Sequence, residues 1–348
     1  MVKNSLDNAD SLGGQALDPA APLLEVENLH VEFRIEDGVV KAVNGLSYTL
    51  HEHETLAILG ESGSGKSVSA QAVMGILDTP PGFVTAGQAN FRGVDLLKVS
   101  EEVMAKQVRG QKVAMIFQDA LTALNPVFTV GWQIAEMLRK HRGMSKKEAK
   151  EQAIELMERV KIPDARDRVN AYPHEFSGGM RQRAMIAMAL SLDPDVLIAD
   201  EPTTALDVTV QAQIMELLHD LQQETGMGLI LITHDLGVVA EVCDRVVVMY
   251  AGEIMEDGDI TDVYHHPAHP YTLGLMDSIP RSDKHTDRLS PIQGAPPDLL
   301  NIPSGCPFHP RCPFVRPRCS EDSPVLSDID RDGHESGCFY WEEVERDR

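Results

Sequence analysis

The hydrophobic positions of this chain fall into short continuous runs rather than alternating ones. The main runs lie at residues 55–59, 112–117, 196–199, 229–233 and 245–249, and most of them are separated by segments with helical spacing. Strands that are apolar on both sides are typical of a parallel sheet covered by helices on both faces. The pattern therefore predicts an α/β fold with a mostly parallel sheet and flanking helices.

Two other parts of the pattern differ from this sheet. Residues 24–43 are strand-like with a turn signal in the middle, which predicts an antiparallel β part near the N-terminus. Between residues 124 and 176 apolar positions repeat at helical spacing, and Ser145 followed by Glu148 matches a capping box. We expect a helical subdomain over about residues 119–190, inserted between two strands.

The two ends of the chain lack this periodicity. Residues 1–22 are polar and rich in Asp, Ala, Gly and Pro, which predicts a flexible leader. After about residue 260 the chain is rich in Pro and His, and the run 265–270 predicts a rigid, extended linker. We expect the leader to be followed by an α/β domain over residues 23–262, and by a C-terminal extension over residues 263–348.

Composition limits the kinds of partner. Of 348 residues, 43% are hydrophobic and 24% are charged, which is ordinary for a globular protein. Asp and Glu number 54 against 31 Lys and Arg, so the formal net charge is −23. A surface this acidic repels phosphate backbones and argues against a nucleic-acid partner. No apolar stretch approaches the ~18 residues of a membrane span and no secretory signal is evident, so we expect a cytosolic protein.

A glycine-rich segment between a predicted strand and a predicted helix is the first candidate binding site. It matches the phosphate-loop pattern G-x-x-x-x-G-K-[ST] and consists of Gly60, Glu61, Ser62, Gly63, Ser64, Gly65, Lys66 and Ser67. Glycines let successive backbone N–H groups surround a phosphate, and the N-terminus of the following helix adds positive potential. We expect Lys66 to contact the β- and γ-phosphates of ATP and the Ser67 hydroxyl to bind Mg²⁺. A glycine-rich surface turn is the alternative.

Two adjacent carboxylates end the apolar run at 196–199. Asp200 and Glu201 would lie at the carboxyl edge of the sheet, where ligands bind in open α/β folds. Asp200 is expected to hold Mg²⁺, and Glu201 to orient and polarise the water that attacks the γ-phosphate. Together with the phosphate loop, this pair predicts an ATPase. The presence of both Glu201 and His234 argues against a regulator that binds ATP without hydrolysing it.

A serine-glycine segment just before these carboxylates resembles a family signature. Residues 177–183 have the sequence SGGMRQR, similar to the LSGGQ sequence of ABC-transporter ATPases but with departures at the outer positions. In that family, the residues matching Ser177, Gly178 and Gly179 meet the γ-phosphate of ATP held by a second ATPase subunit. The resemblance covers about residues 24–260 and implies a P-loop ABC ATPase core. A serine that merely caps its helix is the alternative.

The same resemblance implies roles for single residues. Gln118 corresponds to the glutamine that senses Mg²⁺ and links to the membrane subunit, and His234 to the histidine that contacts the γ-phosphate. Asp207, in the segment 205–207, corresponds to the loop that crosses the dimer interface. Phe33 is the candidate for the aromatic ring that stacks on adenine, with simple packing in the core as the alternative.

The C-terminal extension resembles that of one transporter subgroup. Segments 265–272, 294–297 and 305–313 are similar to the extension of oligopeptide, dipeptide and nickel importer ATPases. The resemblance implies ATP hydrolysis that powers peptide import at the cytoplasmic face of the cell membrane, with nickel or another small solute as the alternative cargo. It implies two membrane permeases, a second ATPase chain and an extracytoplasmic substrate-binding protein as partners. A non-transport ABC ATPase is the remaining alternative.

Four of the five cysteines fall within this extension. Cys306, Cys312, Cys319 and Cys338 follow the spacing C-x5-C-x6-C-x18-C, which lacks the close C-x2-C pairs of structural zinc modules. In a reducing cytosol, clustered cysteines suggest a metal or cluster site more than disulfides. Resemblance to some family members implies a [4Fe–4S] cluster, with zinc or free thiols as the alternatives. Cys243 stands apart and is interpreted as a small core residue.

Overall fold

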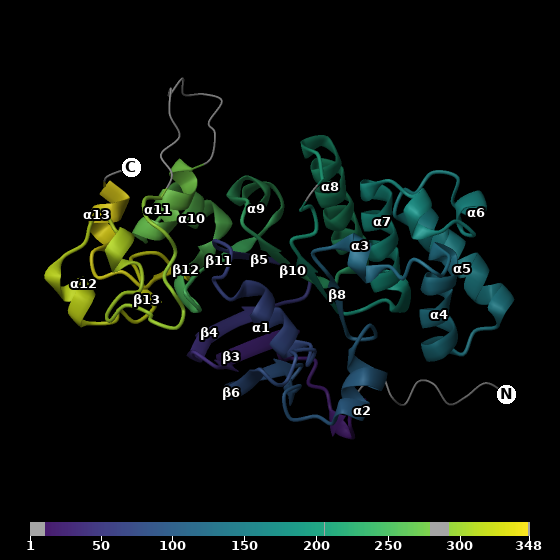
Figure 1. Cartoon of the computed structure of the whole chain (residues 1–348), viewed down its shortest axis with the longest axis horizontal. Helices are drawn as coiled ribbons and strands as arrows, with labels where there is room; N and C mark the ends of the chain where they lie inside the picture. The colour runs from purple at the N-terminus through teal and green to yellow at the C-terminus, as the bar shows by residue number, and fades with distance from the viewer. Residues whose placement is uncertain (1–10, 205, 279–291, 347–348) are drawn as a thin grey trace.

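The centre of the structure, a computed structural model that describes residues 11–204, 206–278 and 292–346, is an eight-stranded sheet. Its strand order is β13-β14-β12-β11-β5-β10-β9-β8 (Figure 1). The strands from β11 to β8 run parallel, which confirms the predicted α/β class. They are β5 (Thr55–Leu59), β8 (Val113–Ile116), β9 (Val196–Asp200), β10 (Gly228–Thr233) and β11 (Arg245–Tyr250).

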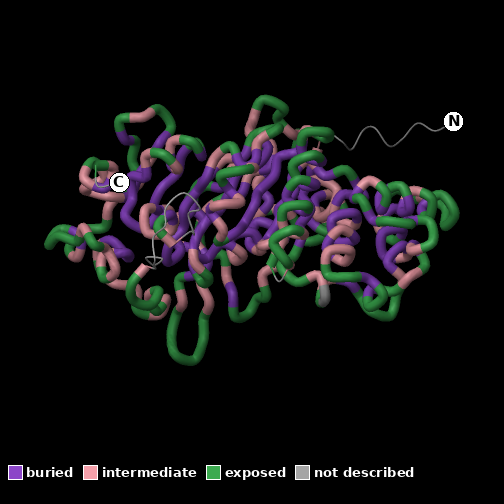
Figure 2. Tube along the Cα trace, turned by 90° about the horizontal axis from the view of Figure 1, so that it is seen from above, coloured by how far each residue is buried: buried purple, intermediate pink, exposed green. Residues whose placement is uncertain are grey.

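The parallel strands are buried on both faces, as their unbroken apolar runs predict. Every residue of β5, β9 and β10 is buried. In β5, Ala57 and Leu59 face one hydrophobic core, the first core, while Leu56 and Ile58 face another, the second core. Successive side chains of a strand point to opposite sides. Figure 2 shows these buried strands through the middle of the molecule. Polar side chains are therefore displaced to the strand ends, where the site forms.

One face of this sheet is covered by an antiparallel sheet in the order β4-β3-β6-β7 (Figure 1). Side chains from it and from α1 form the second core together with alternate residues of the parallel strands. The predicted N-terminal antiparallel part is thus present. Its strands are β3 (Leu24–Ile35), β4 (Gly38–Leu50), β6 (Gly82–Phe91) and β7 (Val94–Asp95), and the adjoining helices are α1 (Lys66–Val73), α2 (Glu101–Val103) and a π-helical turn (Met104–Val108).

The other face is covered by helices. A helical layer at the right of Figure 1 comprises α3 (Ala120–Ala123), α4 (Val130–Arg142), α5 (Lys146–Arg159), α6 (Ala165–Arg168) and α7 (Gly178–Ala189), and α8 (Val208–Thr225) and α9 (Leu236–Val242) continue it. The capping box is present: Ser145 Oγ accepts from the Glu148 amide, and the Glu148 carboxylate accepts from the Ser145 amide. Among the helices described, none is long and apolar enough to cross a membrane.

The C-terminal extension continues the central sheet on its other side. β12 (Glu253–Asp259) pairs antiparallel with β11, β14 (Glu335–Ser336) pairs with β12, and β13 (Ser327–Asp328) ends the sheet. Its helices are α10 (Ile260–His265), α11 (Pro270–Asp277), α12 (Pro317–Glu321) and α13 (Trp341–Arg346), at the left of Figure 1. Because the ladder crosses from the α/β domain into the extension, the two are held together by backbone hydrogen bonds.

The segment 265–270 is not the extended linker that its prolines suggested. Pro270 occupies the first position of α11, where a missing N–H costs nothing. His269 is 1% exposed, and its Nδ1 accepts from the Tyr271 amide at 3.0 Å, so it caps the helix. Burial lowers the pKa of His269 to about 3, so this imidazole is neutral. The run leads into a helix start rather than forming a spacer.

The leader expected over residues 1–22 also differs from the prediction where the structure describes it. β1 (Ser11–Leu12) and β2 (Gln15–Ala16) form a short antiparallel hairpin. Leu12 is 1% exposed and belongs to the second core. A single apolar residue carries no periodicity, so the sequence gives no sign of this contact. Residues 1–10 lie outside the described part.

Replacing Leu12 by alanine tests whether the hairpin contributes to the core. We expect the free energy of unfolding to fall by about 2–4 kcal/mol, because a buried side chain is truncated and leaves a cavity. The measurement is the midpoint of thermal or urea unfolding. Gln15→Ala, at an exposed position of the same hairpin, should change the midpoint little, and equal effects of the two substitutions would contradict the packing.

Candidate active site at the carboxyl edge of the sheet

The phosphate loop, residues 60–67, turns sharply from β5 into α1. A Cβ atom on Gly60 would lie 2.2 Å from the Met249 carbonyl oxygen. A Cβ atom on Gly65, which has φ +104°, would lie 2.2 Å from the Ala42 carbonyl oxygen. Both glycines are therefore required, because the loop runs against the backbone of β4 and β11.

The side chain of Lys66, near the end of the phosphate loop, folds back onto the start of the loop. Its ammonium donates to the carbonyl oxygens of Gly60 at 2.7 Å and Glu61 at 2.8 Å, and the residue is 5% exposed. Burial lowers the pKa of Lys66, while the negative charges of Glu201, Asp200 and Glu61 oppose that change. The loop thus concentrates a desolvated positive charge at the position expected for the nucleotide's phosphates.

The Ser67 hydroxyl and the Asp200 carboxylate meet at the end of β9. Ser67 Oγ donates to Asp200 Oδ1 at 2.9 Å, and Asp200 is 5% exposed. Burial raises the pKa of Asp200, and the hydrogen bond from Ser67 counteracts this. A hydroxyl and a carboxylate are hard oxygen donors of the kind that Mg²⁺ prefers, so the donor set fits the ion expected from the sequence.

Three side chains converge on the carboxylate of Glu201. Gln118 Nε2 and Thr204 Oγ1 each donate to Glu201 Oε2 at 2.8 Å, and His234 Nδ1 lies 3.3 Å from Oε1. The structure thus brings Gln118, Glu201 and His234 together from three separate loops. Thr204 is not among the residues predicted from the sequence, although it lies three residues after Glu201. Gln118 contacts Glu201 here rather than Asp200 or Ser67.

The backbone of Glu201 is in an unfavourable conformation. Its φ is +44°, in the left-handed region that costs a residue with a side chain about 1 kcal/mol or more. The Glu201 amide donates to the Ile232 carbonyl oxygen at 2.9 Å, which holds the turn against β10. Strain of this kind persists where surrounding structure imposes it, and here it directs the carboxylate toward Gln118 and His234.

The serine-glycine segment begins α7. Ser177 Oγ accepts from the Met180 amide at 3.3 Å, and a Cβ atom on Gly179 would lie 2.7 Å from Val210 Cγ1 of α8. Residues 177–179 lie in the helical layer, apart from the phosphate loop ahead of α1 (Figure 1). One chain therefore does not bring this segment to its own phosphate loop.

Two further expected residues have structural roles in the described part of the chain. Asp207 caps α8, because its Oδ1 accepts from the Val210 amide at 3.0 Å. Ala205, in the same segment, lies outside the described residues. Phe33 is half-buried in β3 and packs against the second core, which accords with the packing alternative for this ring. The nucleotide contacts expected of Asp207 and Phe33 stay predictions.

The four cysteines of the extension form one neighbourhood of free thiols. Burial raises the pKa of Cys306 and Cys312 to about 11 and that of Cys338 to about 12, and mutual repulsion with Cys319 adds to each shift. Backbone amides two residues downstream donate to the sulphurs of these three cysteines. Cys243 is 8% exposed and belongs to the first core, as expected.

No metal-ligand group is assembled around these thiols. In residues 11–204, 206–278 and 292–346, no three His, Cys, Asp or Glu side chains are arranged to hold a metal ion. His309, beside the group, has its Nδ1 2.9 Å from the Cys306 carbonyl oxygen. The donor type and the backbone amides suit a thiolate-bound metal.

Comparisons with known proteins cover most of the chain. Residues 43–204 match the ABC transporter family profile, and residues 255–319 match the profile of the oligopeptide/dipeptide transporter C-terminal region. The oligopeptide transport ATP-binding protein OppD of Salmonella typhimurium is 53% identical over 311 residues, covering 89% of this chain and 92% of that protein. The dipeptide transport ATP-binding protein DppD of Bacillus subtilis is 51% identical over 317 residues, covering 91% and 94%.

A solved structure extends the comparison to the fold. The dimeric structure of a post-hydrolysis state of an ATP-binding cassette bound to ADP and Pi matches with a TM-score of 0.61 and 26% identity. It covers 68% of this chain and 98% of that chain. The α/β domain therefore has a counterpart of known structure.

The raised pKa values predict slow alkylation of the extension's thiols. In chelator-treated, metal-free protein at pH 8, Cys306, Cys312 and Cys338 should react with iodoacetamide at least ~10-fold more slowly than free cysteine, because the thiolate is the nucleophile. The rate should rise about tenfold per pH unit toward pH 11. Peptide-resolved mass spectrometry measures the alkylation rate of each cysteine. Reaction at the rate of free cysteine at pH 8 would refute the raised pKa values.

Proposed function

This chain belongs to the ATP-binding subunits of oligopeptide and dipeptide ABC transporters, and we propose that two such subunits close on ATP to drive peptide import. It is an ATPase that powers the transporter. The observation that carries the proposal is the convergence of Gln118, Thr204 and His234 on Glu201, beside the buried charge of Lys66. Peptides are favoured over nickel as cargo because the similar proteins are named for peptides.

Hydrolysis follows from the placement of these charges. The amides of residues 62–67 and the Lys66 ammonium receive the β- and γ-phosphates. Glu201 then accepts a proton from the attacking water as the oxygen–phosphorus bond forms and the bond to ADP breaks. Thr204 holds Oε2, which leaves Oε1 and His234 facing the γ-phosphate.

Ser67 and Asp200, with Gln118 after it moves from Glu201, are proposed to hold Mg²⁺. When bound, the ion neutralises charge on the β- and γ-phosphate oxygens. The buried Asp200 carboxylate supports this role, because burial is tolerated where a cation or donor compensates it.

A second subunit is proposed to complete each ATP site. Ser177, Gly178 and Gly179 present a helix N-terminus, a hydroxyl and close-packed glycines, which suit an anionic γ-phosphate. They lie away from their own phosphate loop, so a neighbouring chain has to supply them. The similar cassette that was solved as a dimer with ADP and Pi supports this arrangement. Asp207, at the start of α8, is proposed to lie at that interface.

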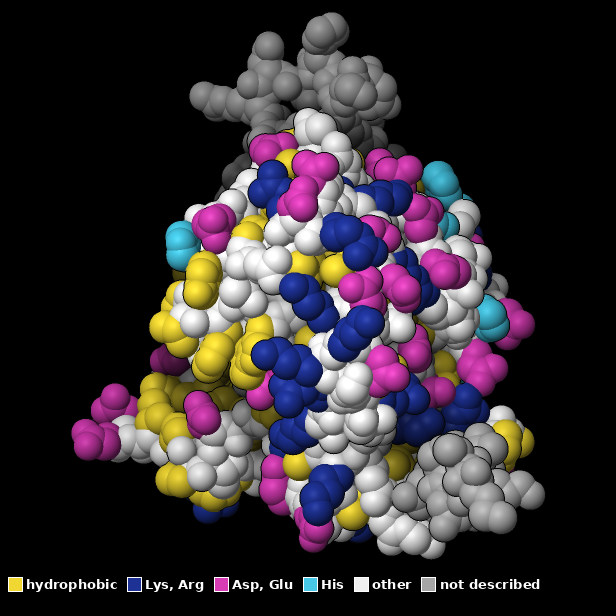
Figure 3. Space-filling view, turned by 90° about the vertical axis from the view of Figure 1, so that its right-hand side faces the viewer, with side chains coloured by type: hydrophobic (Ala, Val, Ile, Leu, Met, Phe, Trp, Pro, Cys, Tyr) yellow, Lys and Arg dark blue, Asp and Glu magenta, His cyan; other side chains and the backbone are white. Residues whose placement is uncertain are grey.

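The permeases are proposed to dock on an apolar groove of about 280 Å³ beside Gln118. Its lining includes Phe117, Met115, Met137, Met185 and Met188. Methionines adapt to partner surfaces, and Phe117 is 43% exposed in the isolated chain. The helical end of the molecule also gathers hydrophobic side chains along one side (Figure 3). Docking there would place the protein at the cytoplasmic face of the membrane.

Other partners follow from the transporter type. A substrate-binding protein would act through the permeases, outside the membrane. The net charge of −23 argues against nucleic acid as a partner and thus against a non-transport ABC ATPase acting on it. The α/β domain over residues 23–262 and the extension over residues 263–348 are proposed as the working parts of the subunit, with the helical subdomain at 119–190 facing the permeases.

Cys306, Cys312, Cys319 and Cys338 are proposed to ligate a [4Fe–4S] cluster. Four clustered thiols and amides donating to sulphur support the proposal, because thiolates bound to iron–sulfur clusters receive such hydrogen bonds. The cysteines would release their protons when they bind the cluster. The bound cluster would then hold the four sulphurs together. Zinc is the competing occupant.

Replacing Glu201 by glutamine should nearly abolish turnover while retaining ATP binding. The amide keeps the size and hydrogen bonds of the carboxylate but does not accept the proton, so we expect a loss of at least ~100-fold in the rate of phosphate release. ATP should now trap a closed dimer, measurable by size-exclusion chromatography. Glu216→Gln, at an exposed position of α8, is the control, and unchanged turnover in Glu201→Gln would refute the role.

Anaerobic purification tests the cysteine site. We expect iron and sulfide, a visible absorption band and an EPR signal after reduction, all lost in Cys312→Ser and kept in Cys243→Ala. A colourless protein with stoichiometric zinc would overturn the cluster.

A further inference from the structure

Glu61, inside the phosphate loop, is held at every polar atom. Its amide donates to the Tyr271 hydroxyl at 2.8 Å, and its carbonyl oxygen accepts from Lys66 Nζ at 2.8 Å. Its carboxylate accepts hydrogen bonds from both terminal nitrogens of Arg311, Nη1 to Oε2 at 2.6 Å and Nη2 to Oε1 at 3.1 Å. Two of these partners, Tyr271 and Arg311, belong to the C-terminal extension.

Arg311 is placed for this contact by its surroundings. Its side chain is 5% exposed, and its Nε donates to the Gln293 carbonyl oxygen at 3.1 Å. The guanidinium carbon lies 5.7 Å from the ring centre of Tyr250 and 5.9 Å from that of Phe308, at distances typical of cation–π contacts. A two-pronged ion pair with a buried guanidinium fixes both partners in one geometry, because a displaced guanidinium would leave a buried charge unpaired.

We propose that Arg311 and Tyr271 are positioning residues for ATP binding, through which the C-terminal extension holds the phosphate loop and Lys66 in place. The route is short: Arg311 fixes the Glu61 carboxylate, Tyr271 fixes its amide, and the Glu61 carbonyl oxygen holds the Lys66 ammonium. Neither residue reaches the phosphates in this route, so both act through Glu61. The inference requires the ATP site and is independent of what the cysteines bind.

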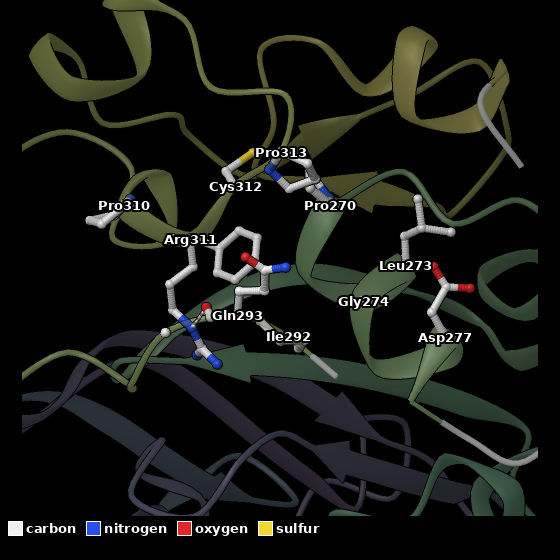
Figure 4. Close-up of a pocket in the computed structure, with 12 residues that line it drawn as sticks. Pro270, Leu273, Gly274, Asp277, Ile292, Gln293, Pro310, Arg311, Cys312 and Pro313 are labelled. Carbon is white, nitrogen blue, oxygen red and sulfur yellow. Dashed lines mark hydrogen bonds between the residues drawn. The ribbon is translucent and has the colours of Figure 1, made fainter. Parts of the chain in front are cut away.

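The geometry also joins this contact to the cysteine region. Arg311 ends a short 3-10 turn (His309–Arg311), and Cys312 follows it directly. Figure 4 shows Arg311 extending toward the strands of the α/β domain while the Cys312 sulphur points the other way; both residues line a cavity of about 620 Å³. A displacement of this turn would therefore move the guanidinium away from Glu61 and loosen the loop.

The test is the dissociation constant of MgATP for the purified full chain. Arg311→Gln should weaken binding about tenfold, and Arg311→Lys, which keeps the charge but loses the two-pronged contact, about threefold. The KM for ATP should rise correspondingly, while kcat at saturating ATP stays within about twofold, because the reacting atoms are untouched. Arg331→Gln, which breaks an ion pair with Glu345 elsewhere in the extension, is the matched control.

A double-mutant cycle isolates the route through Glu61. Glu61→Gln combined with Arg311→Gln should weaken binding about as much as either change alone, because both remove the same contact. Tyr271→Phe, which keeps the buried ring and removes only the hydroxyl, should cost about threefold and applies if Arg311 variants fold poorly. Binding by Arg311→Gln as tight as by Arg331→Gln, or multiplicative losses in the cycle, would overturn the inference. An unmodified chain that binds no MgATP would instead overturn the ATP site itself.

Discussion

The buried ammonium of Lys66 is the charge around which this site is organised. Taking such a group out of water is costly unless anions and carbonyl oxygens surround it. Here partial compensation comes from Glu201, Asp200 and Glu61, which oppose the lowering of the Lys66 pKa by burial without cancelling it. The arrangement demands a loop that curls around one side chain, and thus glycines where the loop meets the backbone of other strands.

The central sheet brings the charged groups that surround Lys66 together. Because β5, β9 and β10 are apolar on both faces, their polar neighbours are forced to the strand ends, and parallel pairing brings these ends to one edge. Glu201 shows how tightly the edge is defined. It adopts a positive φ, which costs free energy, and accepts hydrogen bonds from Gln118 of a neighbouring loop and from Thr204 of its own loop. The strain is sustained by the packing beneath it.

The residues predicted from sequence are those whose signals are local. The phosphate loop, Asp200 with Glu201, and the Ser145 capping box each occupy a few consecutive positions, so spacing alone identifies them. Arg311 contacts Glu61 across 250 positions and has no periodic pattern around it. The helix at Pro270 was missed because proline at a helix start is indistinguishable in sequence from proline in a linker.

The extension is therefore more than an appendage to an ATP-binding domain. Strand β14 joins it to β12 of the central sheet, and Arg311 joins it to the loop that binds phosphate, so two independent contacts span the same boundary. Linkage is reciprocal: if the extension stabilises the loop conformation that binds ATP, then bound ATP stabilises the extension by the same free energy. The turn that carries Arg311 is also the turn that presents Cys312. A change of chemical state at that thiol and a change of nucleotide at the loop thus act on one short stretch of backbone.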